Sequence, residues 1–205
     1  MKLIHKFVFA SLLFFSTHSY SVEIIPLLGF RAGGEFIDDT TDKKHTLESS
    51  EAYGLILSFP YERGKNIEIY YSHQSTKLNS ITINNQPAPN SSVDIPLTID
   101  YLHIGGTAPI SDEKNLKTFV SGGLGFTYSS LDYAGAQSDL RASFSIGVGL
   151  KWPMTERISL QLEARGLATL YNNNSAIYCN GGCAISVNGN LFLQGEVFAG
   201  LGFRF

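Results

Sequence analysis

The chain has few charged residues and, beyond its start, no long apolar run. Asp, Glu, Lys and Arg make up only 16% of its 205 residues, and the formal net charge is −3. Domains that bind nucleic acid are usually strongly basic, so this balance argues against such a partner. After residue 21, no apolar stretch reaches the roughly 20 residues that a membrane-spanning helix requires. Helical periodicity with capping residues is also missing, which argues against a helical domain.

Cysteine is scarce as well: the chain has only Cys179 and Cys183, which flank Asn-Gly-Gly. An exported protein meets an oxidising compartment, and the two glycines allow so small a ring to close. We therefore predict a Cys179–Cys183 disulfide that shapes a loop tip and contributes about 2 kcal/mol. A metal site would require further ligands, which this loop lacks. We expect no metal and no cofactor.

The first 21 residues have the pattern of a secretory signal. Lys2 and Lys6 precede an apolar core from Phe7 to Phe15, and Ser19-Tyr20-Ser21 is a small-x-small cleavage site. The alternative, a membrane anchor, is disfavoured because the apolar run is about half of the roughly 20 residues that a bilayer requires. We expect residues 1–21 to be removed and residues 22–205 to form one domain.

The rest of the chain is rich in alternating stretches that predict half-apolar strands. In the clearest one, 140–152, apolar residues at even positions alternate with polar residues and glycines at odd positions. The last fifteen residues likewise place Leu193, Val197 and Phe203 on one face, and Gln194 and Glu196 on the other. The predicted strands are 24–36, 50–60, 66–76, 95–108, 116–129, 140–152, 157–170 and 190–205.

The connections between these strands alternate in length, which is typical of a transmembrane barrel with surface loops at one end and tight turns at the other. The predicted fold class is therefore all-β: an eight-stranded antiparallel up-and-down transmembrane β-barrel. The long connections are 37–49, 77–94, 130–139 and 171–189, and the short ones are 61–65, 109–115 and 153–156. We expect 37–49, 77–94 and 171–189 to be extracellular contact surfaces.

A barrel of eight strands encloses only enough space for side chains or one small ligand, so a general porin is excluded. The alternation directs charges of both signs, in near-equal number, toward this interior, where they would neutralise one another. We predict that they form a structural ion network that plugs the lumen, with gating or conduction as the alternative. The residues are Arg31, Glu68, Asp100, Arg141, Lys151, Glu163, Arg165, Glu196 and Arg204.

Aromatic residues at strand ends predict the two membrane boundaries. Tyr53 and Tyr128, with Phe36, would mark the outer boundary, and Phe59, Trp152 and Phe205 the periplasmic one.

His103 conflicts with this register. If Ile99 and Tyr101 face lipid, Asp100 points inward but His103 points outward, deep in the membrane. A β-bulge near 101–102 would turn both Asp100 and His103 inward, and this is the interpretation we favour.

The chain resembles the small eight-stranded outer-membrane proteins of Gram-negative bacteria, the OmpA/OmpX/OmpW-like family. The resemblance rests on Gly29–Phe36, on Ser121–Phe126 and on the terminal Phe203-Arg204-Phe205. It implies that Phe203 and Phe205 form the signal read by the barrel assembly machinery. It also implies an outer-membrane location in contact with lipid and lipopolysaccharide, with loops extracellular and the C-terminus periplasmic. We expect a monomer with a structural or cell-surface role, and a passive path for small hydrophobic solutes is the alternative.

His73 and Ser75 are weak candidates for catalysis, and no other catalytic residues are predicted. They share the outward face of strand 66–76, and a histidine can activate a serine hydroxyl if a carboxylate orients it. Such a pair at the membrane boundary resembles the barrel lipid A deacylases, although the surrounding residues do not match that family. Glu51, near the outer end of the neighbouring strand 50–60, is a candidate for that carboxylate. The competing interpretation, polar residues at the headgroup level, is favoured, so a non-enzyme is predicted.

Overall fold

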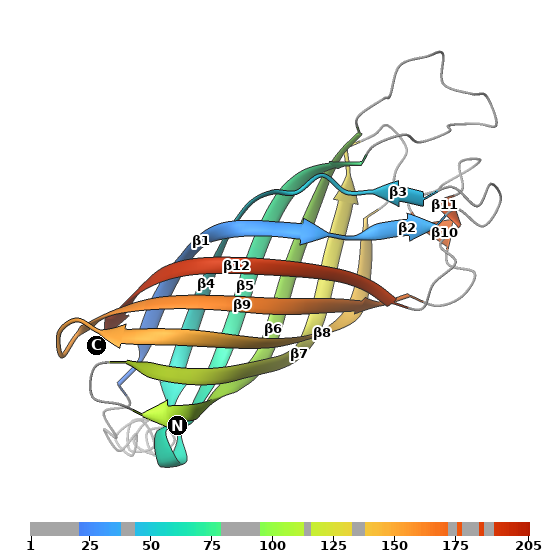
Figure 1. Cartoon of the computed structure of the whole chain (residues 1–205). Coiled ribbons are helices and arrows are strands. Elements are labelled where there is room, and N and C mark those ends of the chain that lie inside the picture. The colour runs from blue at the N-terminus through green and yellow to red at the C-terminus, as the bar shows by residue number, and fades with distance from the viewer. Residues whose placement is uncertain are drawn as a thin grey trace, which may run out of the picture.

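The computed structural model is a closed antiparallel β-barrel (Figure 1). It describes residues 21–37, 44–78, 95–112, 116–132, 138–171, 176–177, 185–186 and 191–205. Around the barrel the strands follow the order β1-β12-β9-β8-β7-β6-β5-β4, so the first and last strands close the sheet. Closure leaves no barrel edge with unpaired backbone groups, which lipid would not tolerate.

The predicted fold class is confirmed, and each predicted strand has a counterpart in the barrel. The bounds differ from the prediction by a few residues at some ends. The barrel strands are β1 (Glu23–Gly33), β4 (Ser50–Pro60), β5 (Asn66–Leu78), β6 (Ile95–Asp112), β7 (Lys117–Leu131), β8 (Asp139–Pro153), β9 (Ile158–Leu170) and β12 (Leu191–Arg204).

Short elements extend the two ends of the barrel differently. At the end with the long connections, two small hairpins project from it (Figure 1). At the other end, a 3₁₀ turn joins β4 to β5, and Arg63 and Gly64 adopt positive φ angles of 57° and 75° there. The hairpins are β2 (Glu35–Ile37) with β3 (Lys44–Thr46) and β10 (Ala176–Ile177) with β11 (Ile185–Ser186), and the turn is η2 (Glu62–Gly64).

The two faces of the sheet follow the alternation of the sequence. Along β12, every second residue from Phe192 to Gly202 is buried and faces the lumen, and the intervening residues are exposed. The interior is largely polar, and it also holds an apolar cluster that includes Leu97, Ile99 and Tyr101. The outer face presents large apolar side chains. This distribution is the one a membrane barrel requires.

The predicted bulge in β6 is wrong. β6 pairs without interruption with β5 over residues 95–107 and with β7 over residues 97–109, and its register shifts only between Pro109 and Ser111. Odd-numbered side chains from Leu97 to His103 therefore face the lumen. His103 points inward as expected, but Asp100 lies on the outer face. The apolar residues Ile99 and Tyr101, which the prediction gave to lipid, instead fill the interior.

Several predicted features lie outside the described residues. These are the signal segment up to Tyr20, the Cys179–Cys183 disulfide and most of the long connections. Within the described ranges, no helix is long and apolar enough to cross a bilayer.

Candidate functional site

The most buried charges form a layer in the half of the lumen nearer the long connections. Arg31 is 0% exposed, and its Nε donates to Glu196 Oε2 at 3.0 Å. Its Nη2 donates to Ser72, while Tyr70 donates its hydroxyl proton to Glu196. The Arg31 guanidinium also lies 4.8 Å from the centre of the Tyr101 ring. Because β5 and β6 are not sheet neighbours of β1 or β12, these contacts span the lumen.

A second layer lies closer to the short turns. Arg165 Nη2 is 2.6 Å from Glu163 Oε1 and 3.8 Å from Glu68 Oε2. Ser121 donates to the same Glu163 oxygen at 2.5 Å, and the Arg165 guanidinium covers the Tyr70 ring at 4.0 Å. Tyr70 therefore connects the two layers, since it contacts both Glu196 and Arg165.

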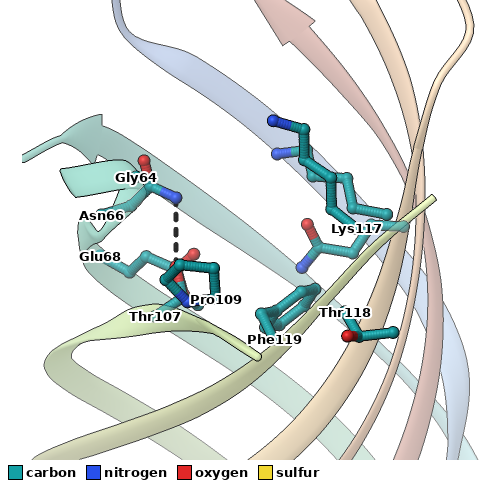
Figure 2. Close-up of a pocket in the computed structure, with 10 residues that line it drawn as sticks. Gly64, Asn66, Glu68, Thr107, Pro109, Lys117, Thr118 and Phe119 are labelled. Atoms are coloured by element: carbon teal, nitrogen blue, oxygen red, sulfur yellow. Dashed lines mark hydrogen bonds between the residues drawn. The ribbon is translucent and has the colours of Figure 1, made fainter. Parts of the chain in front are cut away.

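The third layer lies at the end with the short turns. Lys151 Nζ donates to Glu23 Oε2 at 2.5 Å, and Ser159 donates to Glu23 Oε1 at 2.6 Å. Arg204 Nη2 lies 3.7 Å from Glu23 Oε2 but is half exposed. A pocket of about 50 Å³ remains beside this layer (Figure 2), with Glu68 among its lining residues. That volume admits only a few water molecules.

At the opposite end, Arg141 Nε donates to Asp139 Oδ2 at 2.8 Å, and its guanidinium lies 5.7 Å from the centre of the Tyr171 ring. Both charged side chains are partly exposed at this rim. Eight of the nine residues predicted for the lumen network therefore lie inside the barrel or at its ends. The exception is Asp100.

His103 is held inside the barrel by two serines of β8. Its Nδ1 lies 3.0 Å from Ser145 Oγ, and its Nε2 lies 2.8 Å from Ser143 Oγ. The partner of His103 on β7 is Gly125, which leaves room for the imidazole. The buried ring thus has a hydrogen-bonding partner at each nitrogen.

On the outer face, the structure brings together Asp100, His73 and Ser75. His73 and Asp100 are paired residues of β5 and β6. His73 Nδ1 lies 2.7 Å from Asp100 Oδ1, and His73 Nε2 lies 3.3 Å from Ser75 Oγ. The carboxylate that contacts His73 is therefore Asp100 and not the candidate Glu51. Asp100 was missed because Ile99 and Tyr101 were predicted to face lipid, which assigned Asp100 to the lumen.

Glu23, Tyr70 and Tyr101 are important interior residues that the sequence interpretation did not include in the network. Glu23 shares the parity of Arg31 on the same strand, and Tyr70 shares that of Glu68. Their alternation with outward-facing residues was the sequence feature that could have assigned them to the lumen, but a tyrosine on a membrane strand fits either face. Within the described residues, no group of three or more His, Cys, Asp or Glu side chains is arranged to hold a metal.

Comparisons with known proteins agree with this architecture. Neisserial surface protein A has a TM-score of 0.56 and 12% identity, and the match covers 91% of this chain and 97% of that one. OprG from Pseudomonas aeruginosa has a TM-score of 0.50 and 12% identity, with 91% and 97% covered. At such identity the likeness concerns the fold alone. No curated protein matches the sequence.

The family model described as "Outer membrane protein beta-barrel domain" matches residues 7–205, which is nearly the whole chain. The match and the closed barrel agree on the class of protein, and the description of the family names the outer membrane. This chain therefore belongs to the outer membrane protein beta-barrel family.

Proposed function

We propose that this protein is a closed, monomeric outer-membrane barrel that acts at its exterior, through its outer face and long connections. The observation that carries the proposal is the series of ion-paired layers stacked along the lumen. Arg31–Glu196, Arg165–Glu163 and Lys151–Glu23 follow one another from one end of the interior toward the other. Each would have to be broken before an ion could pass. Buried ion pairs of this kind are costly to disrupt.

The orientation follows from the lengths of the connections. Small outer-membrane barrels have short turns in the periplasm and longer loops outside the cell. The lengths therefore support a position at the cell surface for the end from which 37–49, 77–94 and 171–189 leave, where they would serve as contact surfaces. Arg204 and Phe205 then lie at the periplasmic end.

The proposed partners are lipid, lipopolysaccharide and, during insertion, the barrel assembly machinery. Phe205 is 79% exposed at the end of the last strand, and Phe203 also lies on the outer face. This exposure supports their role as an accessible recognition signal. The outer face of the barrel is apolar around its circumference, which supports direct contact with lipid.

A path for small apolar solutes through the lumen has less support. The described interior is crossed by hydrogen bonds between charged and polar groups, such as Tyr101 to Gln194 at 2.9 Å. An apolar solute would displace these bonds without replacing them, which is unfavourable in a buried site.

Planar-bilayer recording tests the closed lumen. The folded protein, inserted in a lipid bilayer, is expected to give no stepwise ion conductance. A variant with all three pairs truncated (Arg31→Ser, Glu196→Ser, Glu163→Ser, Arg165→Ser, Glu23→Ser, Lys151→Ser) serves as the positive control for a channel of this width. Steps of defined size from the unmodified protein would overturn the proposal.

A further inference from the structure

Three polar side chains stand on the outer face where its apolar band ends. His73 and Ser75 project from β5 on the same side of the sheet, and Asp100 projects from β6 opposite His73. Their neighbours on β6, Leu102 and Ile104, are 52% and 65% exposed. A carboxylate, an imidazole and a hydroxyl that contact one another in that order are the arrangement expected of a candidate catalytic site. The arrangement of this cluster therefore requires an explanation beyond packing.

The geometry of the cluster is that of a nucleophile, a base and an orienting group. The carboxylate is 2.7 Å from Nδ1 of the imidazole, and the serine hydroxyl is 3.3 Å from Nε2. An imidazole that donates from Nδ1 to Asp100 presents an unprotonated Nε2 to Ser75, which is the tautomer required to accept the hydroxyl proton. The distance to Ser75 is slightly long, as it often is before substrate binds.

Two tyrosines fix the orienting half of this arrangement. Tyr71 donates its hydroxyl proton to Asp100 Oδ1 at 2.9 Å. The Tyr53 ring lies against the His73 ring, with centroids 4.7 Å apart. The side chains of His73 and Asp100 remain 18% and 22% exposed, so the site is shielded but still accessible. A shielded, oriented imidazole next to an exposed serine is suited to nucleophilic catalysis.

The height of the site in the membrane indicates the substrate. One row of paired residues around the barrel contains Tyr53, His73, Asp100 and Tyr128, near the end from which the long connections leave. Exposed tyrosines mark the boundary between hydrocarbon and headgroups. The ester bonds that join acyl chains to lipid headgroups lie at this boundary. Lys77, one step further along the same face, would attract a headgroup phosphate.

We propose that Ser75, His73 and Asp100 form a catalytic site that hydrolyses an acyl ester of an outer-membrane lipid. Ser75 Oγ attacks the ester carbonyl carbon as His73 Nε2 takes the hydroxyl proton. The tetrahedral intermediate then breaks the bond to the lipid alcohol, which leaves with the proton from His73. Water from the headgroup region next attacks the acyl-serine, with His73 again acting as the base. This second step releases a fatty acid and regenerates Ser75.

The negative oxygen of the intermediate requires a donor, and backbone N–H groups inside a paired sheet are already used. Two side chains next to Ser75 can supply one. Thr98 of β6 is paired with Ser75. Lys77 lies on β5, two residues after Ser75. Asp100 acts through His73 and is a positioning residue, whereas Ser75 and His73 are the catalytic residues.

Two assays on the folded protein test the proposal. In the first, a fluorophosphonate probe labels reactive serines, and the labelled peptide is identified by mass spectrometry. In the second, released fatty acid is measured in vesicles of phosphatidylethanolamine and phosphatidylglycerol, and separately in vesicles of purified lipopolysaccharide. We expect labelling at Ser75 and fatty-acid release from at least one type of vesicle. The type that reacts identifies the lipid that carries the ester.

The variants separate catalysis from structure. Ser75→Ala and His73→Asn are expected to lower the rate by roughly 100-fold or more. Asp100→Asn should lower kcat with little change in KM, and Asp100→Glu should recover part of the loss. Ser130→Ala is the matched control, because Ser130 is the residue of β7 paired with Thr98, two strands from Ser75. Each variant is first shown to migrate as a folded barrel in unheated gels.

Folded protein that releases no fatty acid from either vesicle and is not labelled at Ser75 would overturn the assignment. Activity that persists in Ser75→Ala would overturn it as well. Neither result depends on the closed lumen, since conductance and hydrolysis are measured independently.

Discussion

Among the described residues, the buried charge of Arg31 is balanced by a single carboxylate. Its side chain is shielded from solvent, and the carboxylate that balances its charge belongs to Glu196. The same carboxylate also accepts hydrogen bonds from Tyr70 and from Ser72, the latter at 3.2 Å. Removing it leaves a buried cation and two hydroxyl donors without their acceptor, and each is costly.

We expect Glu196→Leu to lower the free energy of unfolding by about 3–5 kcal/mol, because the charge of Arg31 is then uncompensated in the interior. The measurement is urea unfolding of the barrel in lipid vesicles, followed by tryptophan fluorescence.

Asp139→Leu is the control for this variant, because the Asp139–Arg141 pair is partly exposed at the rim. Its loss should be about 1 kcal/mol or less. Equal losses for the two variants would show that burial does not determine the strength of these pairs.

At the scale of the strands, β7 and β8 fit together through a glycine. Phe119 and Gly149 are paired residues, and a Cβ added at Gly149 would lie 2.2 Å from Cζ of the Phe119 ring. An aromatic ring over a glycine is a recurrent way to pack a strand that lacks a side chain. The ring also lines the pocket at the turn end (Figure 2).

Gly149→Val is expected to destabilise the barrel by about 1–3 kcal/mol, because the ring must leave its position. In the double variant Gly149→Val/Phe119→Ala, the loss should be smaller than the sum of the single losses, since the collision is gone. Equilibrium unfolding of the unmodified protein, of Gly149→Val, of Phe119→Ala and of the double variant gives the coupling free energy between the two positions.

Gly195→Val is the control, because a Cβ at Gly195 has no atom within 4 Å. A loss in the control as large as that at Gly149 would show that glycine is required by the strand itself, independently of Phe119.

The strands could be predicted from the sequence because their period of two is regular and their ends are marked by polar connections. Which face of β6 points into the lumen was harder to predict. Ile99 and Tyr101 are apolar residues that fill the lumen, so their character suggested lipid and reversed the assignment of Asp100. Periodicity identifies which residues share a face but not which face is inside.

The outer-face cluster was only half predictable for the same reason. His73 and Ser75 lie on one strand and were identified together, whereas the partner of His73 comes from β6. A contact between strands depends on register, and a one-residue error moves the partner to the opposite face. The interior network was more predictable, since several of its charges lie in strands with regular alternation.

For the whole molecule, the essential contact is the one between the first and last strands. β1 and β12 pair over most of their length, and Ala32 faces Gly195 across the junction on the exposed side. Paired residues of antiparallel strands have Cα atoms roughly 4.5–5.5 Å apart, a spacing that a disulfide can bridge.

A protein with Ala32→Cys and Gly195→Cys, and with Cys179 and Cys183 replaced by serine, should form an internal cross-link under mild oxidation in membranes. The cross-link is detected by faster migration in heated, non-reducing gels.

The control for this cross-link is Ala32→Cys/Ala199→Cys, in which the second position lies four residues along β12. That shift moves the sulfurs roughly 13 Å apart along the strand, so no bond should form. Cross-linking of both pairs, or of neither, would contradict the closed register.

The apolar outer face has a consequence for how the chain reaches this structure. Its large apolar side chains point away from the interior, so folding in water would bury few of them. The hydrophobic effect, which drives soluble proteins to collapse, here favours transfer of the chain into a bilayer. Until that transfer is complete, the alternating strands present exposed apolar faces and unpaired edges to one another, as aggregating intermediates do. During transit through the periplasm, delivery of the chain to the membrane by chaperones therefore competes kinetically with self-association.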